Sequence, residues 1–194
     1  MPQIAPKQSP EDPAHLTAMT DDRLMLLFRS DNSEAFSELF RRYSNPVCNF
    51  FRRRLEDPSR AEELTQETFI VVLRGVERYE PRGTFRAYLY GIAMRMVMAE
   101  RRKSTRRESS ALVEPNHSSD PSLDAAIWVR RAIEQLDAED RDIILLREFE
   151  QLTYDEIAAV LHLPVNTVRS RLFRARTALK AFLLPLRPEM RNET

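Results

Sequence analysis

Basic side chains gather near the end of the chain, in the stretch from Pro164 to Lys180, which contains no Asp or Glu. Its cations are Arg169, Arg171, Arg174, Arg176 and Lys180. Guanidinium groups bind phosphate and guanine edges through paired hydrogen bonds, so this pattern suits nucleic acid. The preceding stretch, from Glu134 to Glu156, is by contrast strongly acidic. One small domain is therefore predicted to have a face that favours phosphate and a face that does not.

Two helices around a tight turn are expected to carry these arginines. Thr153 and Glu156 have the spacing of a capping box, which would open a helix from Tyr154 to Leu161. The turn follows at residues 162–164, and the last helix is expected to run over residues 165–184. This is the docking geometry of a helix-turn-helix.

The last helix is predicted to have two unlike faces. Val168, Leu172 and Ala175 share an apolar face, and the remaining arc is polar. The residues of that arc expected to contact duplex DNA are Thr167, Arg169, Ser170, Arg171, Arg174 and Arg176. The start of the helix would enter the groove, and the later arginines would reach phosphates. In the alternative interpretation the arginines are solvated and pair with the acidic residues upstream.

A stripe of acidic and amide side chains lies in an earlier helical stretch, between Ala61 and Phe69. Its members are Glu62, Glu63, Gln66 and Glu67. Such a stripe suits a basic protein partner, and an ordinary solvated helix face is the alternative. Phe69, Val72 and Leu73, at and after the end of this stretch, are expected in the core.

Aromatic residues and arginines are interleaved between Arg78 and Lys103. Bases of single-stranded DNA stack on rings while Arg steers the backbone, so this segment suits an opened duplex. The candidate contacts are Arg78, Tyr79, Arg82, Arg86, Tyr88, Arg95, Arg101 and Arg102. Phe85 and Leu89 are better explained as core residues.

The composition favours an all-α protein, because glycines are few and Leu, Ala, Glu and Arg abound. Two small helical domains joined by a flexible linker are expected, the second containing the helix-turn-helix. The expected divisions are a disordered extension at 1–20, helical domains at 21–103 and 122–184, a polar linker at 104–121 and a tail at 185–194. Predicted helix caps are Thr20, residues 31–33, Ser59 with Glu62, Thr84 and Asp137.

Several classes of function are disfavoured. The proline-rich start lacks an apolar run, which excludes a signal peptide or membrane anchor and favours the cytoplasm. Cys48 is the single cysteine, and His15, His117 and His162 share no metal-ligand spacing, so no metal or cofactor is expected. No catalytic constellation is evident, so the protein is not expected to be an enzyme. The formal net charge of zero disfavours a free-standing DNA binder, but allows one that binds after docking on a partner.

The segments Leu152–Ala158 and Leu163–Arg176 closely resemble the promoter-binding C-terminal domain of bacterial sigma factors. The resemblance is to extracytoplasmic function (ECF) sigma factors, small members of the sigma-70 family. That family often has Gly where Asn166 stands, and the resemblance adds Asn166 to the candidate DNA contacts. Ala61–Phe69 resembles the sigma helix that docks on the clamp helices of RNA polymerase. The family also has Trp near the position of Tyr88.

The resemblance implies a sigma factor that directs core RNA polymerase to promoters, in a stress or envelope response under control of an anti-sigma factor. Residues 62–67 would bind the polymerase, 78–103 the melted minus-ten strand, and the last helix the minus-thirty-five duplex. The free protein would be a monomer. Two alternatives stay open: a helix-turn-helix repressor or activator, and a sigma mimic that binds an anti-sigma factor. The arginines of the last helix argue against the mimic, which needs no phosphate contacts.

Overall fold

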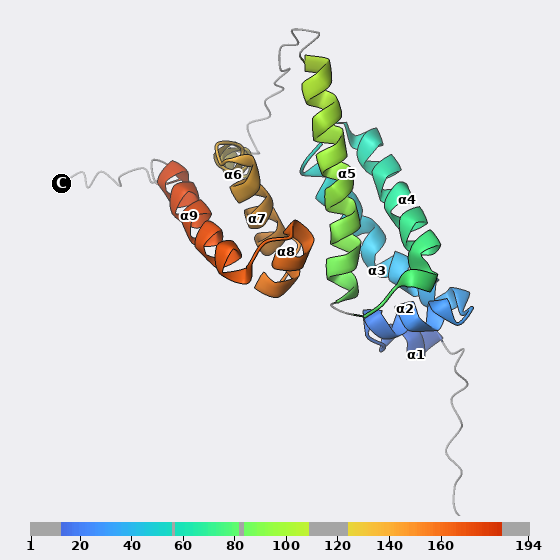
Figure 1. The fold of residues 1–194 in the computed structure, drawn as a ribbon. Coiled ribbons are helices and arrows are strands. Elements are labelled where there is room, and N and C mark those ends of the chain that lie inside the picture. Colours follow the sequence, from blue (N-terminus) through green and yellow to red (C-terminus); the bar gives the residue numbers. More distant parts are fainter. Residues whose placement is uncertain (1–12, 56, 82–83, 109–123, 184–194) are drawn as a thin grey trace, which may run out of the picture. The chain divides into compact units, whose positions relative to one another are not determined.

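The computed structural model describes residues 13–55, 57–81, 84–108 and 124–183 (Figure 1). Over these ranges every regular element is helical and no strand occurs, so the predicted all-α class is confirmed. The chain divides into two compact units, residues 1–103 and 104–194. No helix of the described part is both long and apolar enough to cross a membrane.

The first unit is built around one long helix, α3. Its helices are α1 (Pro13–Thr17), α2 (Asp21–Arg29), α3 (Ser33–Arg52), α4 (Pro58–Gly75), the short 3-10 helix η1 (Val76–Arg78) and α5 (Phe85–Glu108). Helix α3 packs against α1, α2 and α4. Helix α5 lies beside α3 and α4 (Figure 1). It joins the same core, since the ring centroids of Phe50 and Tyr90 lie 5.5 Å apart. Both rings are almost completely buried, as expected for large apolar side chains.

Local capping explains where most of these helices begin. The side chains of Thr20 and Asn32 accept main-chain hydrogen bonds at the starts of α2 and α3, as predicted. Thr84 does the same for the N–H of Ala87, ahead of α5. The predicted Ser59–Glu62 capping box is wrong, because Asp57 caps α4 and accepts from the Ser59 N–H at 2.9 Å. Pro58 takes the first helical position, where a missing N–H costs nothing.

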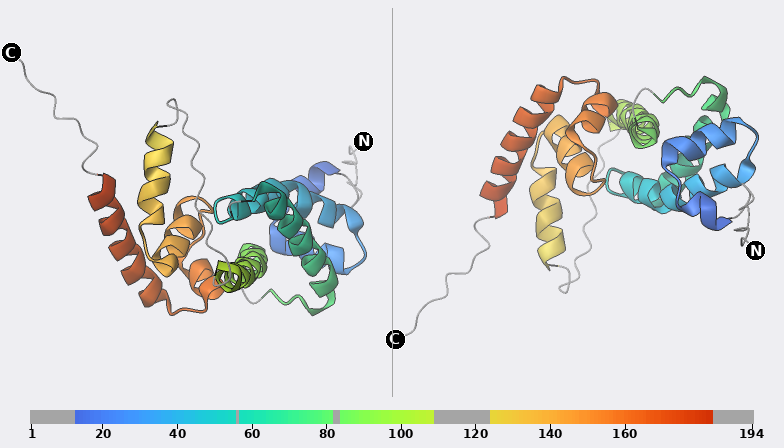
Figure 2. Two further views of the ribbon diagram at one scale, coloured as in Figure 1. Left: turned by 90° about the horizontal axis from the view of Figure 1, so that it is seen from above. Right: turned by 90° about the horizontal axis from the view of Figure 1, so that it is seen from below.

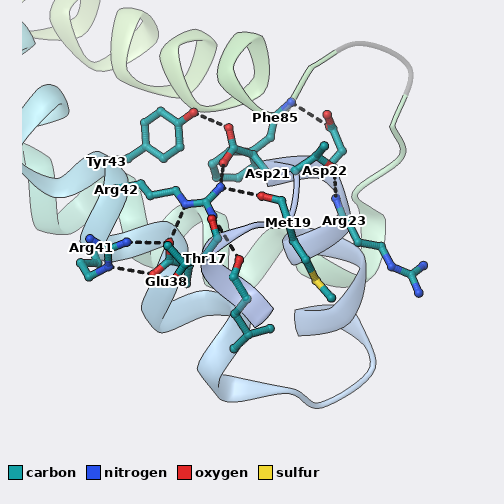
Figure 3. A network of polar contacts seen from close by, with 12 residues as sticks. Thr17, Met19, Asp21, Asp22, Arg23, Glu38, Arg41, Arg42, Tyr43 and Phe85 are labelled. Carbon is teal, nitrogen blue, oxygen red and sulfur yellow. Dashed lines mark hydrogen bonds and ion pairs between the residues drawn. The ribbon is translucent and has the colours of Figure 1, made fainter. Parts of the chain in front are cut away.

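The prediction of disorder over residues 1–20 is wrong for residues 13–20. Leu16 on α1 is buried, and Arg42 of α3 donates to the main-chain carbonyls of Leu16, Thr17 and Met19 (Figure 3). One partly buried guanidinium thus binds three main-chain carbonyls at and just beyond the end of α1. Residues 1–12 lie outside the described part.

The last helix of the first unit extends past its expected end at Lys103. Helix α5 continues through Lys103 to Glu108, into the segment expected to be linker. Residues 104–108 contain no Pro or Gly, so nothing local stops the helix there. The rest of the predicted linker, residues 109–121, and the tail lie outside the described residues.

The second unit consists of α6 (Asp124–Glu134), α7 (Ala138–Glu148), α8 (Tyr154–Leu161) and α9 (Val165–Leu183). Helix α9 packs against the other three, as both views of Figure 2 show. Ile143, Leu146, Ile157, Val168 and Leu172 form the centre of its core. This packing fixes which face of α9 is turned outward.

Candidate nucleic-acid and partner interfaces

The turn between α8 and α9 is set by local contacts. The predicted capping box is present: the Thr153 N–H lies 2.8 Å from Oε2 of Glu156, and the Glu156 N–H lies 3.2 Å from the Thr153 hydroxyl oxygen. His162 ends α8 in the left-handed region, with φ 54° and ψ 43°. Pro164 then accepts from the N–H of Val168 and opens α9. The two helices therefore have the geometry of a helix-turn-helix.

The predicted face of α9 is turned outward. Val168, Leu172 and Ala175 are buried, as expected for the apolar face. Asn166, Arg169, Ser170 and Arg174 are exposed, and Thr167 is partly exposed. Within the described residues Arg174 makes no ion pair, and Arg169 makes only a 3.4 Å contact with Asn166. These side chains are placed where a nucleic-acid backbone can reach them.

Two other predicted arginines of α9 face α7. Arg171 pairs with Glu139 and lies 3.8 Å from Asp140. Nη2 of Arg176 lies 2.6 Å from Oε1 of Glu148, and that hydrogen bond raises the pKa of Arg176. The alternative interpretation, pairing with upstream acids, thus describes these two residues and not Arg169 or Arg174.

One residue of this face was missed from the sequence. Phe173 is 73% exposed, the largest exposed fraction among the large apolar side chains of the described residues. It follows Arg169 by four positions and therefore shares its face. A ring placed outside the apolar stripe was the available signal, since an exposed Phe on a basic face suits contact with thymine methyl groups.

The predicted acidic stripe lies on the outer face of α4. Glu62, Glu63, Gln66 and Glu67 are all exposed. Glu63 and Glu67 are held by Arg60, with Nη1 at 2.7 and 3.1 Å from their carboxylates. Arg60 also binds Glu100 of α5 at 2.7 Å, and with Lys103 it lowers the pKa of Glu100 to about 2. Arg60 therefore orients and partly neutralises two acids of the stripe, Glu63 and Glu67, while Glu62 pairs with Arg52.

Exposed apolar side chains continue this face of α4 beyond the acids. Ile70, Val71 and Leu73 are each about two-fifths exposed, at 43%, 39% and 39%. Phe69 and Val72 are buried as predicted, but the prediction of Leu73 as core is wrong. Leu73 lies seven positions after Gln66, close to two helical turns, and so on the same side of the helix. A mixed acidic and apolar row is typical of a protein-binding surface.

The region predicted to bind single-stranded DNA needs one correction. Tyr79 is only 4% exposed, and its hydroxyl donates to Oδ1 of Asp22 at 2.6 Å, so its ring is not available for stacking on a base. Phe85 and Leu89 are buried, as predicted. Tyr88 is half-buried with its ring 5.2 Å from that of Tyr79. A Cβ atom at Gly75 would lie 2.5 Å from the Tyr88 hydroxyl, so the Tyr88 side chain packs closely on the backbone of Gly75.

The arginines of this region lie nearer the surface. Arg78 on η1 and Arg95 and Arg102 on α5 are exposed, and Arg86 and Arg101 are partly exposed. Arg82 lies outside the described residues. The region thus offers cations along η1 and α5, while most of its aromatic rings stabilise the fold.

Within the described ranges, no cluster of His, Cys, Asp and Glu could hold a metal ion. The candidate surfaces are charged and exposed faces of helices. One helical unit carries a helix-turn-helix with outward arginines, and the other carries an acidic helix face and a line of cations. Together they define a two-unit helical transcription factor.

Comparison with known proteins identifies the family. Residues 39–107 match the family described as Sigma-70 region 2, and residues 126–179 match Sigma-70, region 4. The chain is 31% identical over 188 residues to the RNA polymerase sigma-H factor of Pseudomonas aeruginosa, covering 88% of this chain and 97% of that one. It is 30% identical over 185 residues to the ECF RNA polymerase sigma-E factor of Escherichia coli K12, covering 87% and 96%. The chain belongs to the ECF sigma factors of the sigma-70 family.

Solved structures agree with this assignment. CnrH, in complex with the cytosolic domain of CnrY, has a TM-score of 0.69 and 25% identity, covering 85% of this chain and 97% of that one. The sigma factor RpoE in complex with the anti-sigma factor NepR, from Bartonella quintana, has a TM-score of 0.64 and 21% identity, covering 78% and 98%. The second likeness concerns the fold alone. The predicted family and the function as a sigma factor are confirmed.

Proposed function

We propose that this sigma factor binds core RNA polymerase through α4 and then reads a promoter with both of its units. The observation that carries the proposal is the orientation of α9: its apolar face is buried, so that Asn166, Arg169 and Arg174 are turned outward beside the helix-turn-helix. The bond-making chemistry belongs to the polymerase, and the chain itself is not an enzyme.

The second unit is assigned to the minus-thirty-five duplex. Asn166, Arg169, Ser170 and Phe173 lie in the first half of α9 and would face base edges, with Thr167 beside them. Arg174 lies further along and would bind phosphate. Arg171 and Arg176 are assigned to holding α9 on α7 through their ion pairs, with phosphate contact requiring exchange of those partners.

The outer face of α4 is assigned to the polymerase. Glu62, Glu63, Gln66 and Glu67 offer acceptors to a basic helix. Ile70 and Leu73 continue the same face and would bury apolar surface in the contact. Arg60 would hold the carboxylates in place until a cation of the partner competes for them.

The melted minus-ten strand is assigned to η1 and α5. Arg78, Arg86 and Arg95 would guide the strand backbone, with Arg101 and Arg102 further along α5. Arg82 stays a candidate from the sequence. Tyr88 is the one aromatic candidate for stacking that retains some exposure.

Control by an anti-sigma factor is proposed from the family and from the partners of the similar structures. The zero net charge supports weak binding of promoter DNA by the free protein until it has docked. A cytoplasmic location and a monomeric free state are proposed from the family alone. With Arg171 and Arg176 engaged on α7, Arg174 is the main phosphate contact on α9, so log K for the minus-thirty-five duplex should fall with log salt with a slope of only about −1 from this helix.

Run-off transcription with core polymerase of the source organism tests the proposal. The full chain should initiate at discrete sites of its genome, and a charge-reversed α4 variant, Glu63→Lys with Glu67→Lys, should bind core at least tenfold more weakly. A helix-turn-helix regulator would bind DNA without core and give no initiation. A sigma mimic would bind neither core nor promoter, and either result would contradict the proposal.

A further inference from the structure

Two neighbouring carboxylates at the start of α2 hold different parts of the first unit. Asp21 accepts hydrogen bonds from Arg42 and Tyr43 of α3 (Figure 3). Asp22 accepts from the hydroxyl of Tyr79 at 2.6 Å and from the main-chain N–H of Phe85 at 2.9 Å. Figure 3 also shows the bond from Phe85 to Asp22. Oδ1 of Asp22 therefore links Tyr79, which follows η1, to Phe85, the first residue of α5.

A second residue of α2 strengthens the same connection. Arg29 follows Asp22 by seven positions, two helical turns, and so lies on the same face. Its Nη1 donates to the main-chain carbonyl of Tyr79 at 3.1 Å. Tyr79 is thus held by its hydroxyl and by its backbone, and its ring packs 6.4 Å from that of Phe85.

The tied residues adjoin two arginines assigned to the melted strand. Arg78 directly precedes Tyr79, and Arg86 directly follows Phe85. We propose that Asp22 is a positioning residue for promoter melting: by tying Tyr79 to Phe85, it fixes Arg78 and Arg86 at the separation that the minus-ten strand requires. This inference rests on the assignment of η1 and α5 to that strand.

The sign of the expected effect separates positioning from plain electrostatics. A carboxylate near DNA repels phosphate, so removing it should tighten binding if only its charge matters. If Asp22 orients two cations, its removal should weaken binding, because the arginines lose their fixed spacing. Glu77 of η1 is an exposed carboxylate next to Arg78 and serves as the charge-matched control.

The test uses holoenzyme assembled from the full chain and a single-stranded oligonucleotide that carries the minus-ten element of a promoter transcribed by the wild type. Asp22→Ala should weaken oligonucleotide binding by about tenfold, the scale of losing hydrogen bonds to a charged group. Asp22→Asn keeps an oxygen acceptor and should recover most of that loss. Tyr79→Phe should weaken binding by about threefold, with no further loss when combined with Asp22→Ala.

Three controls make the outcomes distinct. Affinity for core polymerase and for the minus-thirty-five duplex should stay unchanged in every Asp22 variant, and Glu77→Ala should bind the strand as well as the wild type or better. Unchanged or tighter strand binding by Asp22→Ala overturns the proposal. So does a loss of strand, core and duplex binding in parallel with a lower melting temperature, which would mark a general role in stability.

Separate variants test the assignment beneath the proposal. Arg78→Ala and Arg86→Ala should each weaken strand binding. If both leave it intact, the minus-ten assignment itself fails. If both weaken it while Asp22→Ala does not, only the positioning role of Asp22 is refuted.

Discussion

Arg42 and Asp21 form an ion pair with 2.7 Å between Nη1 and Oδ1, and it joins the start of α2 to the middle of α3. The same guanidinium binds Glu38 and the carbonyls at the end of α1. Because the side chains of Arg42 and Asp21 are each only about one-fifth exposed, at 22% and 20%, this contact is poorly screened by solvent. Arg42 therefore connects three helices of the first unit.

Replacing this residue should loosen the N-terminal helices. Arg42→Met is expected to lower the free energy of unfolding by about 2 kcal/mol, since it leaves partly buried acceptors without their donor. Arg41→Met is the matched control, because Arg41 pairs with the same Glu38 but its side chain is 64% exposed. Its effect on stability should be clearly smaller, since solvent screens an exposed ion pair. Urea unfolding of the full chain measures the free energy of unfolding of both variants. Equal losses would contradict the conclusion that Arg42 connects the three helices.

Stability of the first unit should also fall in acid. Hydrogen bonds from Arg41, and also from Arg42, lower the pKa of Glu38 from 4.5 to about 2, against the opposing effect of burial. A carboxyl whose folded pKa is depressed contributes stability above its unfolded pKa and loses it as pH falls through the folded value. The free energy of unfolding should thus be flat above about pH 5 and decline towards pH 2.

Glu38→Gln isolates this contribution. The variant should be less stable at neutral pH and should show a shallower decline in urea unfolding between pH 4.5 and 2. Glu100 titrates over the same range, because Arg60 and Lys103 lower its pKa to about 2, so part of the decline should remain. An unchanged profile in Glu38→Gln would refute the assignment.

The close approach of Tyr88 to Gly75 predicts a compensating pair of substitutions. In Gly75→Ala the new methyl group would lie 2.5 Å from the Tyr88 hydroxyl, whereas the next nearest atom, Cζ, is 3.9 Å away. The single variant should lose about 1 kcal/mol or more through overpacking. Tyr88→Phe removes the clashing oxygen, so the double variant should recover most of the loss in thermal unfolding. Additive losses in the two variants would count against this contact.

The two kinds of arginine on α9 should respond differently to substitution. Arg174→Ala is expected to weaken holoenzyme binding to the minus-thirty-five duplex and to reduce the salt slope by about 0.9, with stability unchanged. Arg176→Ala instead breaks the pair with Glu148, whose partners are each about half exposed, and should change stability by at most about 1 kcal/mol. Anisotropy titrations of both variants over a salt series measure the slopes. Equal slopes would contradict the assignment of Arg174, and not Arg176, to phosphate.

The sequence predicted the elements whose determinants are local. The Thr153–Glu156 capping box, the caps at Thr20 and Asn32 and the apolar face of α9 all depend on residues a few positions apart. The wrong predictions arise where two neighbouring residues can both cap a helix, or where a side chain binds a residue distant in the sequence. Asp57 replaced Ser59 as the cap of α4 because the following proline favours it at that position.

Distant contacts explain why the candidate sites needed revision. Tyr79 was expected at the DNA surface, but its hydroxyl bonds to Asp22, 57 residues away, and no local pattern signals that pairing. Arg171 and Arg176 could not be distinguished from Arg174 until α7 was placed beside α9. Leu73 fits an apolar period, and only the packing of α4 leaves it exposed.

The ion pairs between α7 and α9 have a consequence for how the protein is distributed in a cell. A chromosome offers millions of weak, sequence-independent sites that compete for any strongly cationic helix. With Arg171 and Arg176 already engaged by their own acidic neighbours, fewer cations are on offer to such sites. Molecules that are not bound to core polymerase would then bind nonspecific DNA less, and a larger fraction of them would diffuse freely.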